Sequence, residues 1–177
     1  MERKELSNLE LFVGFFKTEK SLIDFDEIKE HLLKSTARDI FKERRLNGVP
    51  LKWEKNIHWL YEYIKDQFMK HDSNRQIISV GEHETLISKP GELHPTINDI
   101  NIYDLYGSPD YTILFPINGK ATVSLFYDDN RHKDKSWHVD IETNKYIIFN
   151  SSIKYDVSRN EEKENRFIIK TKAHIIY

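Results

Sequence analysis

The chain has 177 residues, enough for one well-packed domain and too few for two of ordinary size. Its 27 Lys and Arg residues nearly balance its 29 Asp and Glu residues, and the net charge of -2 gives no electrostatic reason to bind nucleic acid or an anionic membrane. The absence of cysteine excludes disulfides and zinc–thiolate sites, so His and carboxylate side chains would have to bind any metal.

The N-terminal residues do not resemble a membrane anchor or an export signal. Residues 1–16 contain a short apolar run that Gly14 interrupts, and they lack a small-residue cleavage site. We therefore expect a soluble, unexported protein that has no membrane partner and stays in the cytoplasm.

The first part of the chain, residues 1–74, is predicted to be mainly helical. Asp24 and Glu27 have the spacing of a capping box, and apolar residues then recur at helical spacing as far as Arg44 and Arg45. A second helix is indicated by five apolar residues that share one face: Ile57, Leu60, Tyr61, Ile64 and Phe68.

The pattern changes at Gln76, after which β-branched and aromatic residues come in short runs separated by Gly, Pro, Asn and Asp. The predicted strands are QIISV, ETLIS, INIYDLY, DYTILFPI, KATVSLFY, SWHVDIE, KYIIF, IKYDV and NRFIIKTKAHIIY. Nine strands without an intervening helix favour an antiparallel sandwich or barrel over a parallel sheet. We expect a single domain, residues 1–177, in which residues 75–177 form a β-barrel core and the two helices buttress it.

The strand predicted over residues 120–127 has two mixed faces. Val123, Leu125 and Tyr127 alternate with three residues that point the other way: Thr122, Ser124 and Phe126. Because neither face is wholly polar, we expect this strand to lie between the barrel interior and the covering helices.

Residues 94–170 resemble a known family. The order DYTILFPI, KATVSLFY, SWHVDIE, KYIIFNSS, YDV, NRFIIK is similar to the later strands of the double-stranded β-helix in iron(II)- and 2-oxoglutarate-dependent oxygenases, especially small forms from phage and marine microbes. The resemblance implies a jelly-roll or cupin-like barrel. In that family a His-x-Asp pair and a distal His bind the metal, and an Arg on the last core strand binds 2-oxoglutarate.

Carried over residue by residue, the metal triad is incomplete. Tyr155 stands at the position of the distal His, and Arg166, eleven residues later, stands where the 2-oxoglutarate Arg belongs. His94 matches the first ligand, but the next residue but one is Thr96, so Asp99 could replace the missing Asp only if the loop bulges. A tyrosine phenol, with an ordinary pKa of about 10, is a poor ligand for iron(II).

A literal His-x-Asp sequence occurs at His138-Val139-Asp140, but its position does not fit the family. The next histidine, His174, follows after only two predicted strands, and no Arg comes after it. His138 and Asp140 face the same way on their strand, and we interpret them as an exposed pair.

His94 has two further interpretations. Gly91, His94 and Asn98 are spaced like the tail of the second cupin motif, but about seven predicted strands follow them. The Pro and Gly residues around His94 favour a turn, in which this histidine would have no ligand role.

Arg166 also leaves two alternatives open. It could pair with a carboxylate of the preceding turn, from Glu161, Glu162 or Glu164. It could instead point into the barrel and bind a carboxylate or phosphate there, with hydroxyl groups from Tyr111, Tyr127 and Tyr155 beside it.

We derive three functional hypotheses. The first is a non-catalytic or chemically altered relative of the oxygenases, without a cofactor, that binds a small carboxylate ligand or a protein partner, for example as a phage component in the host cytoplasm or the virion. The second is an active hydroxylase that uses iron(II) and 2-oxoglutarate with a variant metal site containing His94 and Asp99. The third is a cupin-like sugar-binding or isomerase module. Long β edges would also permit a homo-oligomer.

Overall fold

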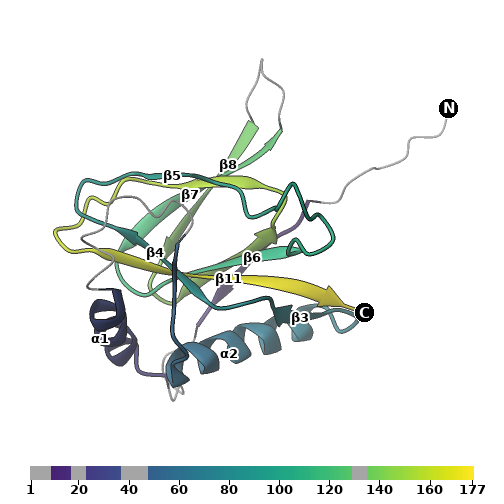
Figure 1. Cartoon of the computed structure of the whole chain (residues 1–177), viewed down its shortest axis with the longest axis horizontal. Helices are drawn as coiled ribbons and strands as arrows, with labels where there is room; N and C mark the ends of the chain where they lie inside the picture. Colours follow the sequence, from purple (N-terminus) through teal and green to yellow (C-terminus); the bar gives the residue numbers. More distant parts are fainter. Residues whose placement is uncertain (1–8, 17–22, 37–47, 129–134) are drawn as a thin grey trace.

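The computed structural model describes residues 9–16, 23–36, 48–128 and 135–177, and within these ranges it contains two helices and eleven strands (Figure 1). In chain order the elements are β1 (Leu11–Phe15), α1 (Phe25–Thr36), β2 (Val49–Pro50), α2 (Lys55–His71), β3 (Gln76–Ser79), β4 (Glu84–Ser88), β5 (His94–Ile97), β6 (Tyr111–Pro116), β7 (Lys120–Asp128), β8 (Lys135–Glu142), β9 (Lys145–Asn150), β10 (Lys154–Val157) and β11 (Arg166–Ile176).

The strands form two antiparallel sheets that face each other. The larger sheet has the order β1-β9-β6-β11-β4-β2, with β3 paired to the far part of β11, and the smaller sheet has the order β5-β10-β7-β8. Successive strands from β6 to β11 lie in both sheets, so the chain crosses between the sheets as it proceeds. This arrangement is a double-stranded β-helix, and it confirms the predicted fold.

The two helices cover the outer face of the larger sheet (Figure 1). A first apolar core joins this face to the helices, with Ile28 and Leu32 from α1, Leu60 and Phe68 from α2, and strand residues such as Ile169. The expectation that helices would cover β7 was therefore wrong. The outer face of β7 carries the partly exposed Thr122, Ser124 and Phe126.

Side-chain caps set the starts of both helices. The Asp24 carboxylate accepts hydrogen bonds from the backbone N–H groups of Asp26 and Glu27, as the capping pattern predicts. The Glu54 carboxylate accepts one from the N–H of Ile57 at the start of α2. The predicted end of α1 at Arg44 and Arg45 lies outside the described residues, and no helix within the described ranges is long and apolar enough to cross a membrane.

The barrel interior is a second apolar core between the sheets. The larger sheet contributes residues such as Leu86, Leu114 and Phe149. The smaller sheet contributes Ile97, Val123, Leu125, Ile141, Tyr155 and Val157. β11 serves both cores because its side chains alternate: Phe167 and Ile169 face the helices, whereas Ile168 faces the barrel.

The structure differs from the local predictions in three places. β1 and β2 lie in the part expected to be mainly helical; they form by pairing with β9 and β4, which are distant in sequence. Residues 94–97, expected to be a turn, form the edge strand β5. Residues 100–106, expected to be a strand, form turns, because Asn101 and Asp104 side chains accept hydrogen bonds from nearby backbone N–H groups.

Candidate functional site

The barrel-facing side of β11 carries three cations in addition to Ile168. Arg166 is paired across the ladder with Ser88 of β4, and Lys170 is paired with Glu84. Lys172 follows on the same face. Both Arg166 and Lys170 have about 1% of their surface exposed. A buried cation requires partners in the barrel, because an isolated charge in an apolar core is strongly unfavourable.

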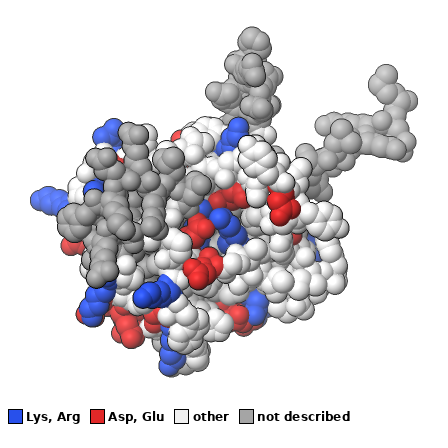
Figure 2. Space-filling view, viewed as in Figure 1, with Lys and Arg blue, Asp and Glu red and all other residues white. Residues whose placement is uncertain are grey.

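Two carboxylates meet these lysines and form what we call the interior charged cluster: Glu84, Asp99, Lys170 and Lys172. Nζ of Lys170 lies 2.9 Å from Oδ1 of Asp99 and 2.7 Å from Oε2 of Glu84. Nζ of Lys172 lies 2.9 Å from Oε1 of Glu84. Figure 2 shows acidic and basic side chains grouped near the centre of the viewed face. The cluster is electrically balanced, with two charges of each sign.

Asp99 reaches the cluster from the segment that follows β5. Its side chain has 2% of its surface exposed. Its second oxygen, Oδ2, accepts a hydrogen bond of 2.9 Å from the hydroxyl of Thr112 on β6, and this hydroxyl also lies 2.9 Å from that of Ser151. Both carboxylate oxygens of Asp99 therefore have partners inside the barrel.

Tyr155 of β10 lies next to this carboxylate. It is fully buried and packs edge-on against Phe149, with ring centroids 5.1 Å apart. Its hydroxyl has no hydrogen-bond partner of regular geometry. Burial, together with the neighbouring carboxylates of Asp99 and Glu84, raises the pKa of Tyr155 well above its ordinary value, so its phenol stays protonated.

The strand register shows which residues lie beside Tyr155. Tyr155 is opposite Ile97 in the β5–β10 ladder, and Asp99 is the next residue but one, so Ile97-Asn98-Asp99 lies beside Tyr155. His94 is opposite Val157 instead. His94, the first residue of β5, and Asp99, two residues beyond its end, are thus separated by the length of the strand.

These residues do not fit a catalytic iron. Ile97 has no donor atom, Tyr155 keeps its proton, and Asp99 is held by Lys170 and Thr112. His94 is buried near the start of β5, where its Nδ1 lies 3.3 Å from the carbonyl of Pro95. Within the described ranges, no group of three or more His, Asp and Glu side chains is placed to bind a metal ion.

At the other end of the barrel, the guanidinium of Arg166 binds backbone carbonyl groups. Its Nη1 donates to the carbonyl of Lys120 at 2.9 Å and of Arg159 at 3.4 Å, and its Nη2 donates to the carbonyl of Ser158 and, at 3.5 Å, to the hydroxyl of Ser88. Burial lowers the pKa of Arg166. The guanidinium joins three segments of the barrel.

The sequence offered two roles for Arg166, an ion pair in the preceding turn and a ligand contact inside the barrel. The observed contacts differ from both. Among the described residues no carboxylate forms an ion pair with it; Glu164 of the preceding turn pairs with Lys29 of α1 at 2.8 Å. Arg166 does point into the barrel, but its contacts are with carbonyl groups of the chain itself. The nitrogen without a partner is Nε, which is buried.

The three tyrosines expected to line one interior are separated. Tyr155 is in the barrel, but Tyr111 faces the helices, where its hydroxyl donates to Glu10 and accepts from Nη1 of Arg75 at 3.0 Å. Tyr127 is partly exposed near the end of β7 and lies 4.8 Å, centroid to centroid, from Trp137. The expectation of a shared tyrosine-lined site was therefore wrong for Tyr111, and Tyr127 lies outside the apolar core that contains Tyr155.

The literal His-x-Asp sequence lies on the outer face of β8, as expected. His138 and Asp140 are exposed. Their side chains contact the neighbouring strand, where Oγ1 of Thr122 donates to Asp140 at 2.7 Å and Oγ of Ser124 lies 3.1 Å from Nδ1 of His138.

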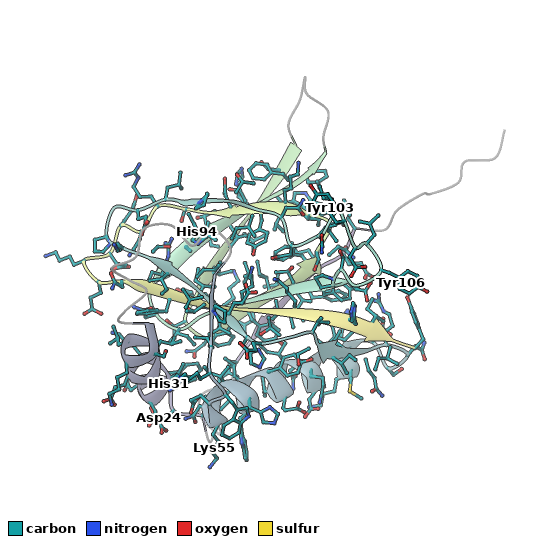
Figure 3. All side chains as sticks on the ribbon, viewed as in Figure 1. Asp24, His31, Lys55, His94, Tyr103 and Tyr106 are labelled. Atoms are coloured by element: carbon teal, nitrogen blue, oxygen red, sulfur yellow. The ribbon has the colours of Figure 1, made fainter. Side chains whose placement is uncertain are left out.

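Residues 98–110, which we call the tyrosine loop, join β5 to β6 and display four large apolar side chains: Ile102, Tyr103, Leu105 and Tyr106. Tyr103 is 93% exposed and Tyr106 is fully exposed. Figure 3 shows both tyrosines at one end of the molecule, away from His94. The loop is ordered from within by Ser108, whose hydroxyl accepts from the N–H of Asn101 at 2.9 Å and donates to the carbonyl of Asp104 at 2.9 Å.

Sequence reasoning missed Lys170, Glu84 and Lys172. The available signal was the alternation along β11, in which Lys170 falls on the same face as Ile168 and therefore on a core position. A lysine at a core position predicts a buried carboxylate partner. The sequence does not say which carboxylate, because Asp99 is 71 residues away.

No protein-family model matches the chain, and no curated protein matches it. Solved structures are similar in fold. The carbocyclase SnoK, an alpha-ketoglutarate-dependent non-heme protein of nogalamycin biosynthesis, has a TM-score of 0.62 at 7% identity, over 92% of this chain and 78% of that one. A prolyl-4-hydroxylase from Pseudomonas putida has a TM-score of 0.58 at 7% identity, over 94% and 91%.

A viral structure is also similar. The collagen prolyl hydroxylase of Paramecium Bursaria Chlorella virus-1, in its 2-oxoglutarate complex, has a TM-score of 0.51 at 11% identity, over 95% of this chain and 96% of that one. At such identities the similarity shows the fold alone. The chain has the double-stranded β-helix fold of 2-oxoglutarate-dependent oxygenases.

Proposed function

We propose that this chain is a non-catalytic double-stranded β-helix protein that acts by binding a protein partner. The observation that carries the proposal is the ion pair between Lys170 and Asp99. The carboxylate beside Tyr155 is bound by an ammonium group of the same chain, in a cluster whose charges already balance. Metal-dependent hydroxylation would require this carboxylate to exchange Lys170 for the metal.

The tyrosine loop supports a protein partner. Exposed aromatic residues on an ordered segment are typical of binding surfaces, since they bury a large area and lose little conformational entropy. Here two tyrosines and two aliphatic residues protrude from one loop that internal hydrogen bonds hold in shape. A component of a phage assembly would be one such partner-binding protein.

The second candidate function is binding of a small carboxylate ligand. The sequence predicted this ligand at Arg166 inside the barrel, but the structure offers a different place. Arg166 is occupied by carbonyl groups, but a surface hollow of about 610 Å³ lies next to the turn that precedes it, and the lining includes Lys120, Lys145 and Arg159. The same lining contains Asp140, Glu142, Glu161 and Glu162, which disfavours a strongly anionic ligand.

The metal part of the proposal is tested by thermal unfolding of chelator-treated protein with manganese(II) or iron(II), with and without 2-oxoglutarate. A ligand that binds the native state raises its stability by RT ln(1 + [L]/Kd), so an unaltered melting temperature is expected. His138→Ala, on the outer face, is the control for non-specific metal binding. A metal-dependent rise that 2-oxoglutarate enlarges, and that Asp99→Ala abolishes, would favour an active hydroxylase.

The partner part is tested by affinity capture with three forms of the chain. The wild type and Trp53→Ala, which changes an exposed aromatic residue outside the tyrosine loop, should retain the same partner. The double variant Tyr103→Ala/Tyr106→Ala should lose it, with an unchanged melting temperature. Equal capture by all three forms would contradict the assignment of the tyrosine loop.

A further inference from the structure

We propose that the ammonium group of Lys170 takes the place of a divalent cation inside the barrel, and that shortening this one side chain opens a site for a hard, oxygen-preferring cation. The inference rests on the proposed absence of metal chemistry in the wild type and extends it. In this proposal Lys170 is the residue that supplies the positive charge in place of a metal ion. The oxygens of Asp99 and Glu84 are the atoms that would bind a metal if Lys170 were shortened.

The first argument is electrostatic. Lys170 contacts both carboxylates of the interior charged cluster, whereas Lys172 contacts Glu84. The Lys170 side chain is 0% exposed and that of Asp99 is 2% exposed, so water cannot compensate these charges. Without Lys170 the buried Asp99 would lack a cation, and an unpaired buried charge strongly favours any counter-ion that can reach it.

The second argument is geometric. Oδ1 of Asp99 and Oε2 of Glu84 both lie within 3 Å of one point, the nitrogen of Lys170. Calcium binds carboxylate oxygens at about 2.3–2.6 Å, so a cation at this point would need the two oxygens to move inward by only about 0.4 Å. The carboxylates are therefore already arranged around a cation, and the cation is an ammonium group.

The third argument is the hydroxyl of Tyr155. It is fully buried and interacts with the carboxylate of Asp99, but this contact lacks regular hydrogen-bond geometry, although a buried polar group normally has such a bond. A cation bound by Asp99 and Glu84 would give this oxygen a partner. The hydroxyl of Thr112, itself 2.9 Å from that of Ser151, binds the other oxygen of Asp99 and orients the carboxylate.

The donor atoms determine which cation is expected. Two carboxylates and the neutral hydroxyl of Tyr155 are hard oxygen ligands, which suit calcium, magnesium and manganese(II) better than iron or zinc. His94 is opposite Val157 in the β5–β10 ladder, whereas Ile97 is opposite Tyr155, so His94 adds no nitrogen ligand. The latent site thus differs in chemistry from a catalytic iron centre.

The experiment titrates calcium and manganese(II) into chelator-treated wild type, Lys170→Ala and Lys172→Ala, and follows the melting temperature. Lys172→Ala is the matched control, because it also removes an ammonium from Glu84 but leaves Lys170 on Asp99. At a cation concentration about one hundred times Kd, Lys170→Ala should melt about 5–10 °C higher than without the cation. The wild type and Lys172→Ala should not respond.

A second variant and a second signal keep the test decisive. Lys170→Ala/Asp99→Asn removes both charges of the pair and should be folded without a cation and unresponsive to one. Terbium(III), a hard cation whose luminescence a nearby tyrosine excites, should emit in Lys170→Ala and lose emission when Tyr155→Phe is added. If Lys170→Ala stays unfolded or unresponsive while the double variant is folded, the proposal is overturned. A response of the wild type contradicts the proposed function instead.

Discussion

Nζ of Lys170 lies 2.9 Å from Oδ1 of Asp99 between the two sheets, and neither side chain has more than 2% of its surface exposed. The lysine comes from the middle of β11 and the aspartate from the segment after β5. Their contact therefore joins the larger sheet to the edge of the smaller one, and it places a buried ion pair beside the apolar core of the barrel.

Loss of this pair should destabilise the fold. Asp99→Ala leaves a buried ammonium with one fewer carboxylate, and removal of one partner of a buried ion pair costs roughly 3–5 kcal/mol. Adding Lys170→Met should recover part of the loss, since both charges are then absent. Urea unfolding measures these differences. The exposed pair Lys120–Glu142, 3.5 Å apart, is the control, and Lys120→Ala should have little effect.

Arg166 should act as a structural residue. Arg166→Met removes the donors of several buried carbonyl groups and should lower the free energy of unfolding by about 3 kcal/mol. Arg166→Lys should not restore it, because an ammonium cannot reproduce the contacts of the planar guanidinium. Arg159→Met, in the same turn but exposed, should change stability little. A full-stability Arg166→Met protein would show that the carbonyl contacts contribute nothing.

His94 should make the fold sensitive to mild acid. Burial lowers the pKa of His94 below its ordinary value of 6.5, so the unfolded chain takes up a proton before the folded chain does. Protonation of His94 therefore does not affect stability above about pH 7, and it lowers the free energy of unfolding increasingly as the pH falls below 6.5. His94→Gln should lose less stability than the wild type between pH 7 and pH 5, measured by urea unfolding at each pH. His138→Gln, at an exposed position, should follow the wild type.

Ser108 should control the order of the tyrosine loop without affecting the barrel. Ser108→Ala removes the hydroxyl that joins Asn101 to Asp104, and the amides of residues 101–108 should exchange with solvent more than tenfold faster, which corresponds to about 1.4 kcal/mol. Exchange in β6 and β11 should stay unchanged. Equal loop exchange in the two proteins would mean that the hydroxyl does not order the loop.

Much of the barrel could be predicted because its strands have local signals. The runs now seen as β6 to β11 are bounded by Gly, Asn, Asp and Pro and rich in β-branched residues, and their ranges agree with the structure to within a residue or two. β5 could not be predicted in this way. It has four residues, contains Pro95 and is stabilised by its ladder with β10.

The candidate site was harder to predict, because the sequence does not show which residue of β5 lies beside Tyr155. The sequence pointed to His94, whereas the ladder places Ile97 there. Strand register depends on the alternation of buried and exposed residues and on the adjoining turns. β5 is short, contains Pro95 and pairs irregularly with β10, so its register could not be read from the sequence.

The amino-acid sequence by itself determined the fold class, the capped start of α1 and the order of the later strands. These features depend on local hydrogen bonds and on the period of apolar residues along a few positions. Only the tertiary structure decided that Lys170 binds Asp99 and Glu84, that Arg166 binds backbone carbonyls and that Tyr111 faces the helices. Those contacts join residues far apart in the chain, and their partners are chosen by strand pairing and burial, which no local pattern encodes.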